Sequence, residues 1–128
     1  MINPEGRSYN MSRIKGRETK PELIVKKILR KKKFIYQSSI YGKPDFSNFE
    51  KKIVIFIDGC FWHRCPRCFK EPITNKTFWV NKISGNVLRD NEVNLNYEKS
   101  GWKVIRIWEH EINIKNLVFL NRLFLIII

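Results

Sequence analysis

Three cysteines stand close together in the segment GCFWHRCPRC, and they are the only cysteines of the chain. Cys60, Cys65 and Cys68 have the spacing Cys-x₄-Cys-x₂-Cys, and the short Cys-x₂-Cys turn presents two thiolates to one ion, as in tetrahedral zinc sites. The fourth ligand has to be His63, His110, a carboxylate or water. His63 lies inside the loop and is available for another role, whereas His110 follows an expected strand and can meet the loop at one sheet edge. We therefore predict a structural zinc site made by the three cysteines and His110.

Carboxylates stand at the ends of two expected strands. Asp45 follows Pro44 in a turn, and Asp58 closes the apolar run 53–57. Carboxylates at strand ends make an oxygen-rich site of the kind Mg²⁺ prefers, and such a metal suits phosphodiester hydrolysis. Turns also use Pro-Asp for conformational reasons alone. Glu22 lies at the edge of the apolar face of an expected helix, either as an outer metal ligand or as a solvated carboxylate among lysines.

A third group of residues shares one face of a long expected helix. Asn86, Asp90 and Tyr97 follow Trp79 by 7, 11 and 18 residues, offsets that return to nearly the same angle around a helix. We expect Asp90 to orient a histidine, because a carboxylate partner fixes the tautomer of the ring. A tryptophan on such a face, as Trp79 is, more often belongs to a hydrophobic core than to a functional site.

The elements that position these residues can be read in order. Thr19 as N-cap and Pro21 in the first turn open a helix that runs to about Lys32. The further elements expected are strands at 34–41 and from residue 45, a central buried strand at 53–57, a helix at 74–99, an inner strand at 102–108 and a final core helix or strand. This order predicts an α/β sandwich with a mixed sheet.

The composition points to a polyanionic partner. The 128 residues contain 25 Lys plus Arg and 12 Asp plus Glu, which gives a formal charge of +13. Nucleic acid is the first expectation and an acidic membrane surface the second. The polar N-terminal stretch lacks a secretory signal, and the apolar C-terminal stretch is too short to span a bilayer, so we expect a cytoplasmic protein.

Six segments, taken in order, resemble the very-short-patch-repair (Vsr) family of DNA mismatch endonucleases. They are MSRIKGRETKPE (11–22), GKPDF (42–46), VIFIDGCFWH (54–63), FW (78–79), NVLRD (86–90) and GWKVIRIWEHE (101–111). The resemblance covers roughly residues 7–112 and is more specific than any single motif. It implies a restriction-endonuclease-like, PD-(D/E)xK-type core: a mixed sheet flanked by helices, with catalytic Mg²⁺ and structural zinc. Residues 19–128 then form one endonuclease domain behind a basic arm at 1–18.

The resemblance also implies roles for individual residues. Asp45 is the expected Mg²⁺ ligand, together with the backbone carbonyl of Ile57. His63 is expected to activate the attacking water or relay its proton, and Asp90 to orient His63. Glu22 is implied as an accessory acid near the metal.

The substrate implied is double-stranded DNA with a T:G mismatch, nicked on one strand 5′ of the mismatched thymine. Phe61, Trp62 and Trp79 match the aromatics that enter the helix, and such insertion costs less where the pair is already mismatched. The basic arm would hold phosphates. Its candidate contacts are Arg13, Lys15 and Arg17. We expect a monomer that acts beside mismatch-repair proteins or a DNA cytosine methyltransferase.

The chain departs from the family pattern at two places. Ile57-Asp58 replaces Thr-His, so Asp58 either gives the metal a second acid through water or shapes a phosphate contact. His110 replaces a cysteine after Trp-Glu, an exchange that keeps four zinc ligands. Two other functions stay open: a restriction-type or homing-type nuclease on matched duplex, and a non-catalytic, zinc-stabilised DNA-binding module.

Overall fold

The structure is a computed structural model that describes residues 19–37 and 39–127. The expected basic arm at 1–18, with Arg13, Lys15 and Arg17, lies outside the described residues. The elements in chain order are α2 (Lys20–Ile28), β1 (Ile35–Tyr36), β2 (Phe46–Asn48), β3 (Ile53–Asp58), α3 (Lys76–Lys99), β4 (Lys103–Trp108), the 3₁₀ turns η1 (Glu109–Glu111) and η2 (Ile114–Asn116), and α4 (Leu117–Ile127).

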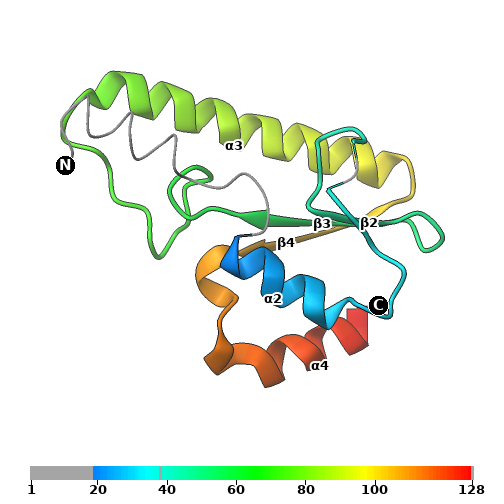
Figure 1. The fold of residues 1–128 in the computed structure, drawn as a ribbon. Coiled ribbons are helices and arrows are strands. Elements are labelled where there is room, and N and C mark those ends of the chain that lie inside the picture. The colour runs from blue at the N-terminus through cyan, green and yellow to red at the C-terminus, as the bar shows by residue number, and fades with distance from the viewer. Residues whose placement is uncertain (1–18, 38, 128) are drawn as a thin grey trace.

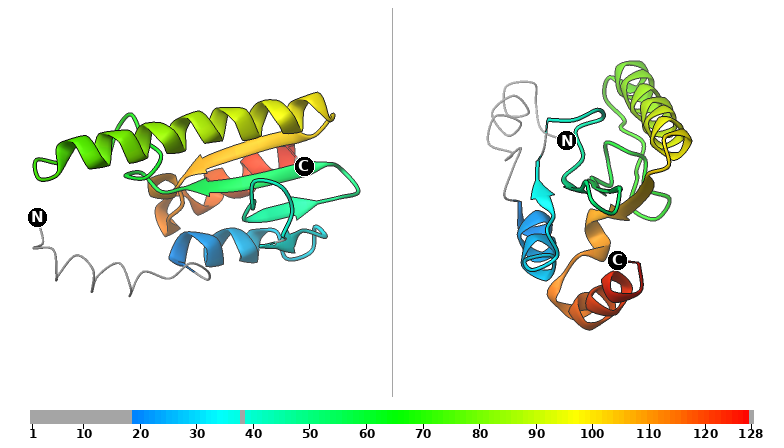
Figure 2. Two further views of the ribbon diagram at one scale, coloured as in Figure 1. Left: turned by 90° about the horizontal axis from the view of Figure 1, so that it is seen from above. Right: turned by 90° about the vertical axis from the view of Figure 1, so that its right-hand side faces the viewer.

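The described strands form one mixed sheet in the order β1-β2-β3-β4. β1 and β2 are antiparallel, as are β2 and β3, whereas β3 and β4 run parallel with Phe56 opposite Arg106 and Asp58 opposite Trp108. Figures 1 and 2 show α3 along one side of the sheet and α2 with α4 on the other. The α/β fold with a mixed sheet between helices, expected from the sequence, is thereby confirmed.

Strand β3 is apolar at five successive positions because both of its faces are covered. Ile53 and Ile55 pack in a core with α2 and α4, in which Leu120 and Phe124 of α4 are buried. Val54 and Phe56 face the other way and pack against α3. This alternation places the strand end at Asp58 on the side of the sheet that α3 covers.

Two strand expectations need correction. The first strand is only Ile35–Tyr36 instead of 34–41, because Gln37 adopts a left-handed backbone with φ 50°, which ends the extended chain. The strand expected at 102–108 as an inner strand is β4, which lies at the edge of the described sheet.

The helices agree with the expected caps but are shorter. The Thr19 hydroxyl accepts a hydrogen bond from the backbone N–H of Glu22, and Pro21 lies in the first turn, as expected. The helix ends at Ile28 instead of Lys32. α3 begins at Lys76 after the left-handed Asn75 and continues unbroken to Lys99.

The apolar C-terminal stretch forms a core helix, one of the two forms expected for it. α4 spans 11 residues. Within the described part of the chain, no helix is long and apolar enough to cross a membrane.

Candidate active site and metal centre

Asp45 lies just before β2, beside the end of β3. Its Oδ2 accepts a hydrogen bond from the backbone N–H of Ile57 at 2.7 Å. The pKa of the Asp45 carboxyl is raised from 3.8 to about 6, chiefly by burial; the charges of Glu22 and Asp58 add to the rise, while the Ile57 N–H and His63 oppose it. Two further carboxylates thus lie near enough to Asp45 to repel its charge, and a bound cation would relieve that repulsion.

Glu22 is buried, with 6% of its surface exposed, so the reading of it as a solvated helix carboxylate is wrong. Its Oε1 accepts hydrogen bonds from the Tyr36 hydroxyl at 2.6 Å and from the Gln37 amide at 3.0 Å. The Thr19 hydroxyl donates to its Oε2 at 2.8 Å. These neutral donors stabilise the carboxylate without cancelling its charge, so the charge acts on Asp45.

His63 and Asp90 form the pair expected from the sequence. His63 Nδ1 lies 2.5 Å from Asp90 Oδ2, across the gap between the cysteine loop and α3. Asn86, one turn earlier on the same face of α3, donates to the backbone carbonyl of Trp62 at 3.1 Å and fixes the loop there. Because Nδ1 is bonded to a carboxylate, Nε2 is the ring nitrogen that can accept a proton from another group.

Asp58 belongs to the same cluster. Its Oδ1 lies 3.9 Å from His63 Nδ1 and accepts a hydrogen bond from Arg106 Nη1 at 2.9 Å. Burial raises the pKa of the Asp58 carboxyl above its ordinary value, and the Arg106 guanidinium partly offsets that rise.

Arg106 was missed by the sequence reasoning. The signal was an arginine in the middle of the apolar strand KVIRIW. The pairing of Arg106 with Asp58 depends on the parallel register of β3 and β4. In this register Arg106 lies opposite Phe56, two residues before Asp58 on the neighbouring strand.

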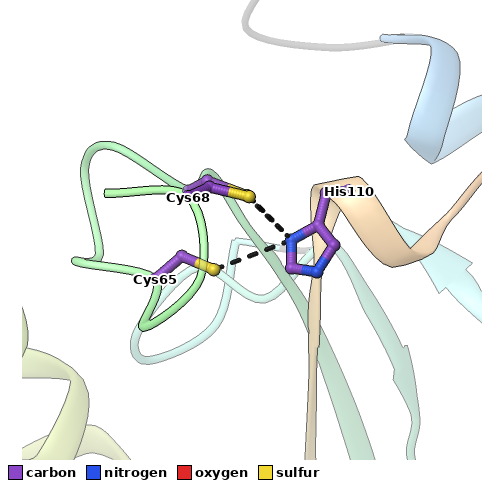
Figure 3. Close-up of side chains that lie close together, drawn as sticks. Cys65, Cys68 and His110 are labelled. Atoms are coloured by element: carbon purple, nitrogen blue, oxygen red, sulfur yellow. Dashed lines mark hydrogen bonds between the residues drawn. The ribbon is translucent and has the colours of Figure 1, made fainter. Parts of the chain in front are cut away.

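The three cysteines and His110 converge as expected for a zinc site. The Cys60, Cys65 and Cys68 sulfurs lie 3.3, 3.6 and 3.4 Å from His110 Nδ1. In a tetrahedral zinc site the metal–ligand bonds place sulfur and nitrogen about 3.5 Å apart, so the donor set fits this metal. Figure 3 shows Cys65 and Cys68 on the loop pointing toward the His110 ring on η1.

The thiols also differ in acidity. Burial raises the pKa of Cys60 to about 12. Burial opposes ionisation of Cys65 as well, but the backbone N–H groups of Arg67 and Cys68 lower its pKa. A cation bound among them would favour the thiolate form of each ligand.

The expected intercalating aromatics form one cluster. Phe61 and Trp62 are partly exposed and have ring centroids 5.3 Å apart, and each lies 5.6 Å from the Trp79 ring. Trp79 is buried, with 6% of its surface exposed. In this conformation the buried Trp79 ring therefore packs against the two partly exposed aromatic rings of the loop.

Comparisons with known proteins agree with this arrangement. The family model described as DNA mismatch endonuclease Vsr matches residues 1–68, which is more than half of the chain. The chain belongs to the Vsr family of DNA mismatch endonucleases.

Relatives of this family cover most of the chain. The type II nicking enzyme V.NaeI of Lentzea aerocolonigenes is 40% identical over 114 residues, 83% of this chain and 69% of the relative. V.NmeAIP, a type II nicking enzyme of Neisseria meningitidis, is 41% identical over 114 residues, 85% of this chain and 81% of the relative. The DNA mismatch endonuclease Vsr of Escherichia coli strain K12 is 38% identical over 108 residues, 80% and 69% of the two chains.

The Vsr membership and the enzyme class expected from the sequence, a DNA endonuclease, are thereby confirmed. The roles of single residues, the T:G preference and the identities of the metals remain predictions.

Proposed function

We propose that this Vsr-family chain is a Mg²⁺-dependent endonuclease that nicks one strand of duplex DNA 5′ of the thymine of a T:G mismatch. The observation that carries the proposal is the meeting of two groups at one end of the sheet. Asp45, with Glu22 and Asp58 near it, supplies negative oxygen ligands. The His63–Asp90 pair lies beside them, 2.5 Å between Nδ1 and Oδ2.

Asp45 would hold the Mg²⁺, with the backbone carbonyl of Ile57 as the further ligand. When bound, the ion supplies charge neutralisation at the scissile phosphate and a lowered pKa of its water. His63 would take the proton of the attacking water at Nε2, and Asp90 would stabilise the imidazolium that results. The negative charge of Glu22 would raise the pKa of Asp45 and add to the attraction for the cation.

The zinc centre would have a structural role. Zinc bound by Cys60, Cys65, Cys68 and His110 would fix the loop that carries Phe61, Trp62 and His63. The two loop aromatics, with Trp79 next to them, would enter the base stack at the mismatch, where unstacking costs least. The basic arm would add salt-dependent contacts to phosphates. Mismatch-repair proteins or a cytosine methyltransferase are the partners that this reaction would have.

A nicking assay tests the proposal. Supercoiled and linear duplexes that differ only in one pair, T:G or the matched pair, are incubated with and without Mg²⁺. We expect nicks 5′ of the mismatched thymine, only with the metal, and none after Asp45→Asn. Glu50→Gln makes the same chemical change at an exposed carboxylate that pairs with Lys33, and should retain the activity.

The same assay decides between the alternatives. Equal cleavage of matched and mismatched duplex would favour a restriction-type nuclease. Tight DNA binding with no Mg²⁺-dependent nicking would favour the DNA-binding module, and full activity of Asp45→Asn would refute the metal site.

A further inference from the structure

Arg106 is a charged residue in the middle of strand β4, on the face that α3 covers. The neighbouring Ile105 and Ile107 point to the opposite core, beneath the sheet. The Arg106 guanidinium lies 4.1 Å from the centre of the Phe56 ring, and its side chain is 18% exposed. Packing on an aromatic face with little exposure restricts the guanidinium to few orientations.

The polar contacts of Arg106 link two elements. Nη1 donates to Asp58 Oδ1 at 2.9 Å and lies 3.6 Å from Asp90 Oδ1. Nε donates to Asn94 Oδ1 at 2.7 Å, one turn beyond Asp90 on α3. One guanidinium therefore joins the end of β3 to the middle of α3.

Both carboxylates held by Arg106 face the same imidazole nitrogen. His63 Nδ1 is 2.5 Å from Asp90 and 3.9 Å from Asp58. Two carboxylates that converge on one point repel each other, and the guanidinium between them offsets that repulsion. Asp58 is only 5% exposed, so loss of Arg106 would leave a buried carboxylate that has lost its closest positive charge.

We propose that Arg106 is a positioning residue for His63. By fixing Asp58 and Asp90 together, it sets the direction of the imidazole and hence of Nε2. This rests on the proposed function, in which His63 accepts the proton of water. It also assigns Asp58 to the histidine cluster as the partner of Arg106, a role different from the metal and phosphate contacts considered for it from the sequence.

Kinetics separate positioning from DNA binding. The single-turnover nicking rate and the dissociation constant for T:G duplex are measured for Arg106→Ala, Arg106→Lys and the control Arg122→Ala, an exposed arginine on α4. We expect the rate of Arg106→Ala to fall on the order of 10- to 100-fold, as for misplaced catalytic groups, with the dissociation constant changed less than about threefold. Arg106→Lys should recover part of the rate, and added guanidinium ion should recover part of it in Arg106→Ala. An unchanged rate, or affinity lost in proportion to the rate, would overturn the proposal.

A double-mutant cycle guards against misfolding. Arg106→Ala combined with Asp58→Asn leaves Asp58 with no unpaired buried charge, so the double variant should be more stable than Arg106→Ala, and the rates are compared at a temperature at which circular dichroism shows all three variants folded. If Arg106 and Asp58 act as a unit, the rate loss of the double variant is smaller than the product of the two single losses. Independent, multiplicative losses would contradict the inference.

A spectroscopic measurement needs no substrate. The chain has two histidines, so the ring proton resonances of His63 and His110 are readily told apart. We expect the downfield Nδ1 proton of His63, bonded to Asp90, to shift or disappear in Arg106→Ala while His110 is unaffected. An unchanged His63 signal would refute the positioning role. If the wild-type protein nicks no T:G duplex, the proposed function fails, and this measurement still judges Arg106.

Discussion

At the scale of single residues, the burial of Asp45 changes the acidity of its carboxyl group. The pKa of its carboxyl is raised from 3.8 to about 6 because burial and the nearby acids disfavour the charged form. At a carboxyl group with a raised pKa, a proton and a metal cation compete for the same oxygen atoms. The same features that make the ionised side chain unfavourable alone therefore make a divalent cation a suitable partner.

The stability of the Mg²⁺-free protein should show this competition. The folded-state pKa of Asp45 lies above its unfolded value, so the protonated carboxyl contributes to the stability of the folded protein. This contribution is fully present below about pH 3.8 and is lost as the pH rises through about 6. Asp45→Asn should remove this pH dependence and be more stable than the wild type at pH 8, by up to about 3 kcal/mol from the shift of 3.8 to about 6. Urea unfolding from pH 4 to 8 measures the difference.

Mg²⁺ supplies the control for that prediction. Adding Mg²⁺ at pH 8 should stabilise the wild type and leave Asp45→Asn unchanged, because only the wild type offers the ionised ligand. Glu50→Gln should behave as the wild type. Parallel pH profiles for the wild type and Asp45→Asn would show that Asp45 is not the group with the raised pKa.

Asp90 offers a second test at the residue scale. Asp90→Asn keeps the shape of the side chain but removes the charge next to His63 Nδ1. We expect a single-turnover nicking rate lower by about 10² to 10⁴, the range that general acid–base groups contribute, with DNA affinity retained. Glu92→Gln, an exposed acid on the same helix, is the matched control. A rate within a factor of two of the wild type would remove Asp90 from the mechanism.

At the scale of elements, two glycines in contrasting settings test how α3 packs on the sheet. Gly42 has φ +76°, and a Cβ there would lie 2.8 Å from Val93 of α3. Gly85 lies inside α3, and a Cβ there meets no atom within 4 Å. Gly42→Ala should lower the free energy of unfolding by about 1–3 kcal/mol, through backbone strain and overpacking.

The matched change on α3 should have the opposite sign. Gly85→Ala should raise the free energy of unfolding by up to about 1 kcal/mol, because alanine is the better helix former and nothing obstructs it. Thermal unfolding in the same buffer compares the two variants. A stabilising Gly42→Ala would mean that the turn and α3 pack differently from the structure.

The elements also show what the sequence can and cannot predict. The cysteine cluster and the shared face of Asn86 and Asp90 were predictable, because loop spacing and helical offsets are local geometry, whereas the pairing of His63 with Asp90 came from the family resemblance. Arg106 was not, since its partners depend on the register of strands that are far apart in the chain. Glu22 was expected at a helix edge, and its burial depends on Tyr36 and Gln37 of another element. Long-range pairing, rather than local pattern, was the missing information.

At the scale of the whole molecule, the proposed zinc centre connects parts of the chain that are distant in sequence. The loop 59–69 supplies three cysteines and η1 supplies His110. Apart from the metal ligands, Cys60 N–H donates to Glu109 Oε1 at 3.3 Å, and Arg64 donates to Ser84 of α3 at 2.9 Å. Asn86 and Asp90 also hold the loop to α3, through the Trp62 carbonyl and His63, so zinc would chiefly order the side of the loop that faces η1.

Zinc removal should therefore loosen one end of the molecule before the rest. We expect one Zn²⁺ per chain by elemental analysis, and loss of the metal in Cys65→Ser together with a lower midpoint of thermal unfolding. Ser84→Ala removes the Arg64 contact but no ligand, and should keep the full zinc content. A Cys65→Ser protein with unchanged zinc and unchanged stability would contradict the site.

Hydrogen exchange would show how far the effect of zinc extends. β3 is covered on both faces, by α3 and by α2 with α4, and none of these contacts needs the metal. In zinc-free protein the backbone amides of 59–69 and 109–111 should therefore exchange faster, while those of β3 stay protected. Because His63 is on that loop, its bond to Asp90 should weaken at the same time, and nicking should fall more steeply than stability. Equal loss of protection in β3 and in the loop would instead mean that the zinc centre and the core unfold as one unit.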